Sequence, residues 1–158
     1  MIKTAKIIFS DIDLTDKQAT VSMAKLIEID SAELVQELTA IGTCDFGHAV
    51  ITKGYSTNYT NYIFVPVSDL QNPQNRINTE LIHQAIRSAL KLAKLYEIKD
   101  ITVELPTMRD EKTIYSLRAW GLSLKRVVKQ PLDRERIKEV ITSISRDFPG
   151  ILIDFEYL

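Results

Sequence analysis

An apolar segment, a long amphipathic segment and a second apolar segment follow one another in the middle of the chain, and this order limits the possible folds most. Tyr62 to Val67 is apolar at nearly every position, which is typical of a strand covered by helices on both sides. Asn78 to Tyr96 carries apolar residues at helical spacing, and Asn78 is its predicted N-cap. Ile101 to Leu105 is again apolar. Strands that alternate with helices predict a layered α/β domain with a mixed sheet.

The remaining elements are predicted from apolar periodicity and from residues that favour caps and turns. Further strands are expected at Ala5–Phe9, Ala19–Ile29, His48–Lys53 and Ile151–Tyr157. Further helices are expected from Asp30 or Ser31 to about Ile41, from Thr113 to about Lys129, and after a cap at Asp133. Apolar and polar residues alternate over 151–157, so this strand is expected near a sheet edge. No repeat or linker divides the chain, which predicts a single domain over residues 1–158.

The composition excludes several classes of protein. Of the 158 residues, 45% are hydrophobic and 26% are charged, as in a soluble globular domain, and the net charge is −1. No span approaches membrane length and the N-terminus lacks the apolar run of a signal peptide, so a cytoplasmic protein without a membrane partner is expected. Cys44 is the single cysteine, which excludes an internal disulfide and a cysteine-based zinc cluster.

The segment from Gly42 to Tyr55 reads Gly-Thr-Cys-Asp-Phe-Gly-His-Ala-Val-Ile-Thr-Lys-Gly-Tyr. With the strand, helix and strand that follow it, this segment resembles the middle of a macro domain, an ADP-ribose-binding α/β family. In that family a Gly-x-Ala-Val-Ile-Thr-x-Gly-Tyr segment precedes the same three elements. The resemblance is strongest from Gly42 to Leu105, and it implies a three-layer α/β/α fold with a mixed β-sheet.

A short segment after the first predicted strand bears on ligand binding. Phe9-Ser-Asp-Ile-Asp13 resembles the Gly-Asp-Ile-Thr start of macro domains. The resemblance implies that Asp11 accepts a hydrogen bond from the adenine amino group and that the backbone N–H of Ile12 serves the adenine ring. The alternative is that Asp11, Asp13 and Asp16 are loop and turn residues.

The chain departs from the family in the segments that hold ribose and phosphate. Macro domains carry an Asn-Ala-Ala-Asn segment after the second strand and then a glycine-rich loop, but Ser22–Lys25 stands in this region and no glycine precedes Gly42. Their second phosphate loop is also rich in glycine, whereas Leu105–Lys112 contains none. Arg109 and Lys112 are candidates to replace backbone donors with charge, and a solvated basic loop is the alternative. ADP-ribosyl hydrolase activity is therefore not expected.

Aromatic residues offer two further binding surfaces. Phe155 and Tyr157 lie where the family often presents an aromatic side chain to adenine, although Phe155 on an alternating strand also fits a core position and Tyr157 a frayed terminus. Tyr55, Tyr59 and Tyr62 form a tyrosine cluster that would suit a pocket or a subunit interface.

Catalytic and metal-binding patterns are sparse. Cys44 and His48 have the residue types of a nucleophile and its base, but a small buried cysteine is the favoured interpretation. His48 and His83 alone do not make a metal site, so neither a metal nor another cofactor is predicted.

The charge distribution leaves several partners open. The segment Arg109–Lys138 is basic, with nine Lys/Arg and four Asp/Glu. The segment Ser10–His48 is acidic, with two Lys/Arg and eight Asp/Glu. The basic segment would suit a phosphate-containing ligand, nucleic acid or an acidic face of a neighbouring subunit in a homo-oligomer. The leading hypothesis is a non-catalytic macro-like module that binds ADP-ribose or a related nucleotide. The alternative is a degenerate macro-like module for protein interaction or oligomerisation, without nucleotide binding.

Overall fold

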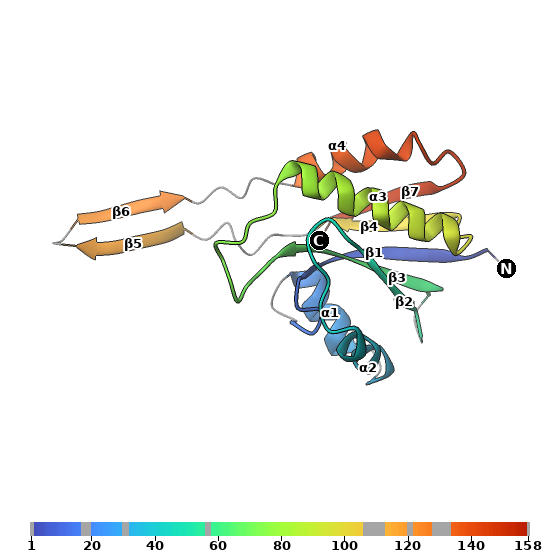
Figure 1. Cartoon of the computed structure of the whole chain (residues 1–158), viewed down its shortest axis with the longest axis horizontal. Coiled ribbons are helices and arrows are strands. Elements are labelled where there is room, and N and C mark those ends of the chain that lie inside the picture. Colours follow the sequence, from blue (N-terminus) through green and yellow to red (C-terminus); the bar gives the residue numbers. More distant parts are fainter. Residues whose placement is uncertain are drawn as a thin grey trace.

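A five-stranded sheet with helices on both faces forms the main body of the computed structural model (Figure 1). The structure describes residues 2–16, 20–29, 32–55, 58–105, 113–119, 122–127 and 134–157. The elements in chain order are β1 (Thr4–Asp11), α1 (Val21–Ile29), α2 (Ala32–Ile41), β2 (Val50–Lys53), β3 (Asn61–Ser68), α3 (Thr79–Leu95), β4 (Asp100–Leu105), β5 (Thr113–Ala119), β6 (Leu122–Val127), α4 (Arg134–Ser145) and β7 (Leu152–Tyr157). No helix in these ranges is both long enough and apolar enough to span a bilayer.

The strand order of the main sheet is β2-β3-β1-β4-β7. Strands β1, β3, β4 and β7 run parallel, and β2 pairs with β3 in the antiparallel direction. The prediction of a mixed sheet is confirmed, as is the edge position of the last strand. Because the parallel strands share a direction, their carboxyl ends meet at one edge of the sheet.

The helices bury both faces of β1, the central strand. On one face α3 and α4 cover a large core that includes Ile7 and Phe9, and on the other face α1 and α2 cover a smaller core that includes Ile8. Successive side chains of a strand point to opposite faces, so this arrangement explains why β1 is apolar at adjacent positions. The predicted three-layer α/β/α architecture is confirmed.

The long helix α3 begins and packs as its sequence predicts. The Asn78 side-chain oxygen accepts a hydrogen bond from the backbone N–H of Leu81 at 2.8 Å, which confirms the N-cap. One stripe of α3 is buried against the sheet, and its residues are Ile82, Ala85, Ile86, Ala89, Leu90 and Ala93. The spacing of these residues is that of one helix face.

The strand predicted at Ala19–Ile29 is wrong, because residues 21–29 form helix α1. Alternation at Val21 and Met23 suggested a strand. However, Met23, Leu26 and Ile27 also fit helical spacing, and all three pack against the core on the α1 and α2 face. Thr20 caps the helix, since its hydroxyl accepts from the N–H of Met23 at 3.1 Å.

The helix predicted from Thr113 to about Lys129 is also wrong, because β5 and β6 form an antiparallel hairpin there. Two short runs rich in apolar, aromatic and β-branched residues flank Gly121 in the sequence, and this pattern is typical of a hairpin. Residues 128–129 and the predicted cap Asp133 lie outside the described residues.

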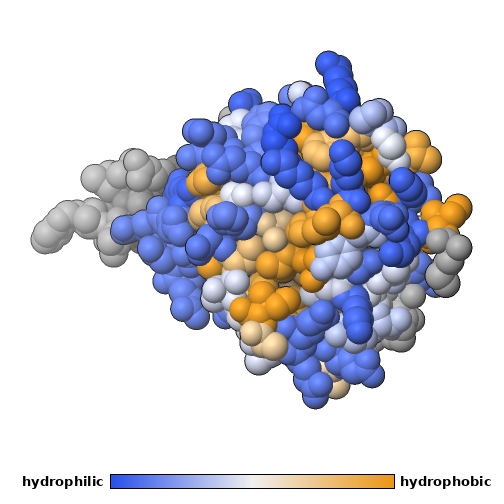
Figure 2. All heavy atoms as spheres, turned by 45° about the vertical axis from the view of Figure 1, so that its right-hand side comes forward, coloured by the Kyte–Doolittle hydropathy of each residue, from blue (hydrophilic) through white to orange (hydrophobic). Residues whose placement is uncertain are grey.

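Apolar side chains also reach the surface at the amino edge of the sheet. Figure 2 brings this side of the molecule forward and shows hydrophobic residues between hydrophilic ones. Ile2, Leu95 and Leu152 are each more than two thirds exposed. A small hollow of about 230 Å³ lies at the same edge and includes Ile98 and Phe148 in its lining, so it is remote from the carboxyl ends of the strands.

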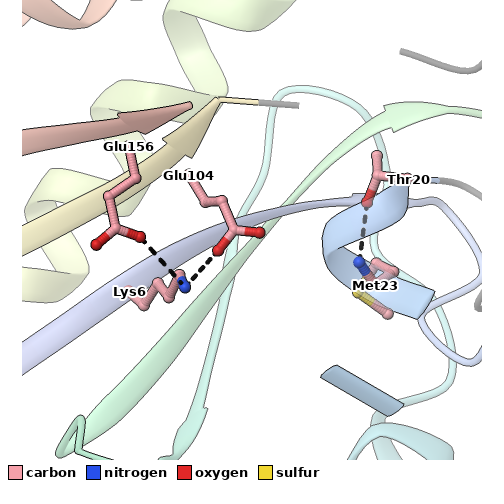
Figure 3. Close-up of polar contacts among 5 residues, drawn as sticks. All are labelled: Lys6, Thr20, Met23, Glu104 and Glu156. Carbon is pink, nitrogen blue, oxygen red and sulfur yellow. Dashed lines mark hydrogen bonds and ion pairs between the residues drawn. The ribbon is translucent and has the colours of Figure 1, made fainter. Parts of the chain in front are cut away.

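A charged cluster ties together the three strands on the β7 side of the sheet (Figure 3). Lys6 on β1 forms an ion pair with Glu104 on β4, and its amine lies 3.6 Å from a carboxylate oxygen of Glu156 on β7. The side chains of Lys6 and Glu104 are 18% and 8% exposed. Burial lowers the pKa of the Lys6 amine, but the hydrogen bond and charge of Glu104, with smaller effects of Tyr59 and Glu156, raise it by more. The net pKa therefore lies above the ordinary value of 10.5.

Glu104→Gln should lower the free energy of unfolding by about 3 kcal/mol, because it leaves the largely buried Lys6 amine without its main counter-charge. The double variant Lys6→Met/Glu104→Leu should recover most of this loss, since neither charge is then buried. Urea unfolding at neutral pH measures both values. Glu139→Gln, an exposed change on α4, is the control and should shift stability by less than about 0.5 kcal/mol.

The pH dependence provides a second readout of the same pair. A raised pKa of Lys6 means that its contribution is complete below pH 10.5 and is lost as the pH rises through the folded-state pKa. The wild type should therefore lose more stability than the double variant above pH 10.5. Equal losses in Glu104→Gln and in the double variant would show that the ion pair is not what stabilises this region.

Candidate functional site

The carboxyl edge of the parallel strands is the candidate site. Ligands in open α/β sheets usually bind beyond the carboxyl ends of the strands. Here β1 ends at Asp11, β3 at Ser68, β4 at Leu105 and β7 at Tyr157. The ends of β1 and β3 are neighbours, and the structure describes the residues that directly follow both strands.

Asp11 joins the ends of β1 and β3. One carboxylate oxygen accepts hydrogen bonds from the Ser68 hydroxyl at 2.7 Å and the Leu70 N–H at 2.9 Å. The other accepts from the Asp13 N–H at 3.0 Å. Asp11 is 1% exposed, and burial raises the pKa of its carboxyl group above the ordinary value although these three hydrogen bonds oppose the shift.

The peptide groups of Ile12 are bonded within the chain. Its N–H donates to the Ser68 carbonyl at 2.9 Å, and its carbonyl accepts from the Cys44 N–H at 2.9 Å. Asp13 completes the turn by accepting from the N–H and the hydroxyl of Thr15, at 3.0 and 2.7 Å. Asp11 and Ile12 therefore lie at the carboxyl edge, where they were expected, and also hold the loop that follows β1.

The start of α1 lies against the end of β1, an arrangement that was not anticipated. Thr20 binds both elements, because its hydroxyl donates to the Phe9 carbonyl at 2.8 Å and accepts from Met23 (Figure 3). Ser10 and Ser22 are 0% and 2% exposed, and their hydroxyl groups have no hydrogen-bond partner in the described part of the chain. The segment was expected to be a strand, so this site was missed. Thr20 ahead of apolar residues at helical spacing was the signal.

Backbone N–H groups without a hydrogen-bond partner among the described residues lie at the start of α1. The first N–H groups of a helix have no acceptor within the helix. The Thr20 hydroxyl accepts from the N–H of Met23, and the Thr20 carbonyl accepts from the N–H of Ala24. The N–H groups of Val21 and Ser22 remain at the helix start, where no described residue accepts from them. Together with the positive end of the helix dipole, such donors favour an anion.

Of the other predicted ligand residues, two lie apart from Asp11 and two lie outside the residues that the structure describes. Arg109 and Lys112 belong to residues 106–112, which the structure does not describe. Phe155 packs against the core beneath α4, and Tyr157 is 51% exposed. The amine of Lys138 lies 5.4 and 5.5 Å from the centres of these two rings. No hydrogen bond or ring contact among the described residues joins this aromatic pair to Asp11.

The tyrosine cluster contributes to the core rather than to the carboxyl edge. Tyr62 is buried, and its ring centre lies 6.2 Å from that of Tyr59. Tyr55 and Tyr59 pack against the core on the α1 and α2 face, and the Tyr55 hydroxyl donates to Glu37 at 2.7 Å. These contacts explain the tyrosines by packing.

Cys44 and His48 do not form a nucleophile and base pair in the described residues. The buried Cys44 thiol lies 3.7 Å from the Asp45 carbonyl, and no hydrogen bond connects it to His48. Burial, with a smaller effect of the Asp45 charge, raises the pKa of the thiol to about 11. No group of three potential metal ligands occurs among His, Cys, Asp and Glu in the part that the structure describes.

The Cys44 thiol should react slowly with thiol reagents in the native protein. With a pKa of about 11, it is almost entirely protonated at pH 8. Labelling should be at least about a hundredfold slower than in the same protein unfolded in urea, where burial no longer suppresses the thiolate. Stopped-flow absorbance with an aromatic disulfide measures both rates. Comparable rates would contradict a buried, protonated thiol.

Comparison with known proteins places the chain in a family. Residues 25–111 match the family model of the macro domain, which is more than half of the chain. The chain belongs to the macro domain family. This family binds ADP-ribose.

Solved macro domain structures share the fold at low sequence identity. The macro domain of ganglioside induced differentiation associated protein 2 is 17% identical, with a TM-score of 0.68 over 98% of this chain and 70% of that chain. The D40A mutant macrodomain of Oceanobacillus iheyensis is 13% identical, with a TM-score of 0.67 over 98% and 76%. A Trypanosoma brucei macrodomain in complex with ADP-ribose is 15% identical, with a TM-score of 0.68 over 97% and 57%. No curated protein matches the chain.

Within this macro domain, the proposed counterpart of the asparagine segment needs correction. From the sequence, Ser22–Lys25 was matched to the Asn-Ala-Ala-Asn segment, which follows the second strand in the family. In the structure these residues lie inside α1, and no strand separates β1 from α1 in the described residues. The absence of glycine before Gly42 is unaffected by this correction.

Proposed function

We propose that this macro domain is a non-catalytic module that binds ADP-ribose or a related nucleotide at the carboxyl edge of its sheet. The family supplies the ligand class. The observation that carries the proposal is the pair of buried, unpartnered hydroxyl groups of Ser10 and Ser22 beside the N-terminus of α1. Buried polar groups are normally hydrogen-bonded, so hydroxyl groups left over at a helix start indicate a ligand with acceptor oxygens.

The phosphate end of the ligand would lie at the start of α1. The N–H groups of Val21 and Ser22 and the Ser22 hydroxyl supply donors without any glycine-rich loop. Arg109 and Lys112 would add charge from the loop after β4. Contacts from these charged side chains would make binding more sensitive to salt than contacts from the backbone N–H groups of a helix terminus.

The base end would lie near Asp11 and Ile12, with Phe155 and Tyr157 as the aromatic residues from the far strand. Asp11 is held in place by three donors, so its carboxylate is rigid. A rigid acceptor loses little conformational entropy when it binds an adenine amino group. Its remaining acceptor capacity would serve that group.

ADP-ribose should stabilise the protein, and Ser22→Ala should weaken binding about tenfold by removing a hydroxyl donor to the phosphates. The same change should leave the unliganded fold at least as stable, because the hydroxyl group is buried without a partner. Calorimetry measures the affinity. In thermal denaturation, a ligand at about 100 times its dissociation constant adds about 2.7 kcal/mol. Ser143→Ala, an exposed serine on α4, is the matched control.

Two further ligand and variant combinations separate the ends of the site. Ribose 5-phosphate lacks the base, so Asp11→Asn should weaken ADP-ribose but not ribose 5-phosphate, while Ser22→Ala should weaken both. A strong salt dependence that Ser22→Ala does not change would instead assign the phosphates to Arg109 and Lys112. Absence of any shift with ADP-ribose, ADP or ribose 5-phosphate would contradict the proposal.

No appreciable ADP-ribosyl hydrolase activity is expected. The chain lacks the asparagine segment and both glycine-rich loops on which hydrolytic macro domains depend. Burial raises the pKa of the Cys44 thiol to about 11, and no hydrogen bond joins it to a base in the described residues, so it does not supply an alternative nucleophile. Incubation with an ADP-ribosylated protein should release no more ADP-ribose than a blank. Release that a point substitution in this chain abolishes would overturn the non-catalytic assignment.

A second function is favoured by one specific observation. The Ile12 N–H donates to Ser68, and the Asp11 carboxylate accepts from Ser68, Leu70 and Asp13. These hydrogen bonds stabilise the loop after β1 without a ligand. A degenerate macro domain that serves protein interaction or oligomerisation, without nucleotide binding, would keep these contacts. It would show no thermal shift with any of the three ligands.

A further inference from the structure

We propose that this macro domain forms a symmetric dimer in which the β5–β6 hairpin of each copy pairs with the open edge of β7 in the other. This inference does not depend on nucleotide binding. It rests on an unpaired sheet edge, an unsupported hairpin and the opposite charges of the two segments.

The outer edge of β7 has no partner strand in the part of the chain that the structure describes. β7 is last in the strand order, and within the described residues β4 is its single neighbour in the sheet. The Leu152 N–H donates to the Lys99 carbonyl at 2.8 Å, so Leu152 directs its backbone groups toward β4. Backbone direction alternates along a strand, and Ile153, Phe155 and Tyr157 therefore present their N–H and C=O groups outward. Such an edge is a template for another strand.

The β5–β6 hairpin belongs to no larger sheet among the described residues. Its two strands pair with each other in a separate two-stranded sheet, and Figure 1 shows this hairpin extending away from the main body. An isolated two-stranded hairpin is marginally stable in water at best. Because it extends outward rather than along its own sheet, it is presented to a second molecule. Its strands of 7 and 6 residues match the 6 residues of β7.

Charge selects the partner of the β7 edge. β7 carries Asp154 and Glu156 and no basic residue, so two β7 strands paired across a two-fold axis would bring like charges together. The hairpin strands carry Arg118, Lys125 and Arg126 and no acidic residue. Pairing the hairpin with β7 would therefore bring together strands of opposite charge. It would also cover Leu152, which is 68% exposed.

Reciprocal exchange closes the assembly. Each copy offers one hairpin and one β7 edge, so two copies related by a two-fold axis pair both hairpins with both β7 edges. A closed dimer is expected rather than a filament. The two cores are built from residues of the main sheet and its helices, so each copy is expected to stay folded when the hairpin is replaced.

Sedimentation velocity of the full chain, without nucleotide, tests the proposal. The wild type should sediment as a dimer that dissociates on dilution, and replacement of residues 113–127 by a short Gly-Ser linker should give a folded monomer. Asp154→Lys should weaken the dimer about tenfold, because each of two symmetric interfaces loses a favourable charge pair. The hairpin variant Lys125→Glu/Arg126→Glu should weaken it similarly, and the combined variant should restore most of the affinity.

Hydrogen exchange gives an independent readout at the same edge. The N–H groups of Ile153 and Phe155 should be protected in the wild type and should exchange faster in the variant without the hairpin. A monomer at every concentration would overturn the proposal. If those N–H groups were still protected in a monomer, the hairpin would pair with its own β7. A dimer that survives both the hairpin replacement and Asp154→Lys would place the interface elsewhere.

Discussion

The burial of β1 between two strands and two helix layers is the constraint on which the rest of the structure depends. Ile7, Ile8 and Phe9 are all buried, although successive side chains point to opposite faces of the sheet. The chain must therefore supply helices for both faces. It does so with α1 and α2 on one side and α3 and α4 on the other. Every polar group on or beside β1 must then find a partner, because water does not reach it.

This requirement explains the polar features of the central strands. Lys6 points to a face that α1 and α2 do not fully cover, and Glu104 and Glu156 neutralise it. Asp11 ends the strand and accepts from three donors, which are the Asp13 N–H, the Ser68 hydroxyl and the Leu70 N–H. Ser10 and Ser22 are the exceptions in the described chain, since their buried hydroxyl groups lack partners. The same rule that makes Asp11 structural makes these two serines candidates for binding a ligand.

Prediction from the sequence succeeded where one period was unambiguous. The buried stripe of α3 repeats at helical spacing over about three turns, from Ile82 to Ala93, and Asn78 caps the helix as expected. Prediction failed at Val21–Ile29 and at Thr113–Val127, where the apolar residues fit more than one period. Short segments of this kind take the structure that their tertiary contacts stabilise. Here the helix is favoured because it packs Met23, Leu26 and Ile27 against the core that includes Ile8 and Phe64.

The sequence by itself determined the layered α/β class, the family resemblance centred on Gly42–Leu105, the strands of the main sheet and the absence of glycine-rich loops. These features depend on residue type and local spacing, which a sequence contains. The tertiary structure alone decided that α1 starts against the end of β1 and that Ser68 closes on Asp11. Each of these depends on which strands are neighbours. Residues such as Asp11 and Ser68 are 57 positions apart, and only the packing of the sheet brings them together.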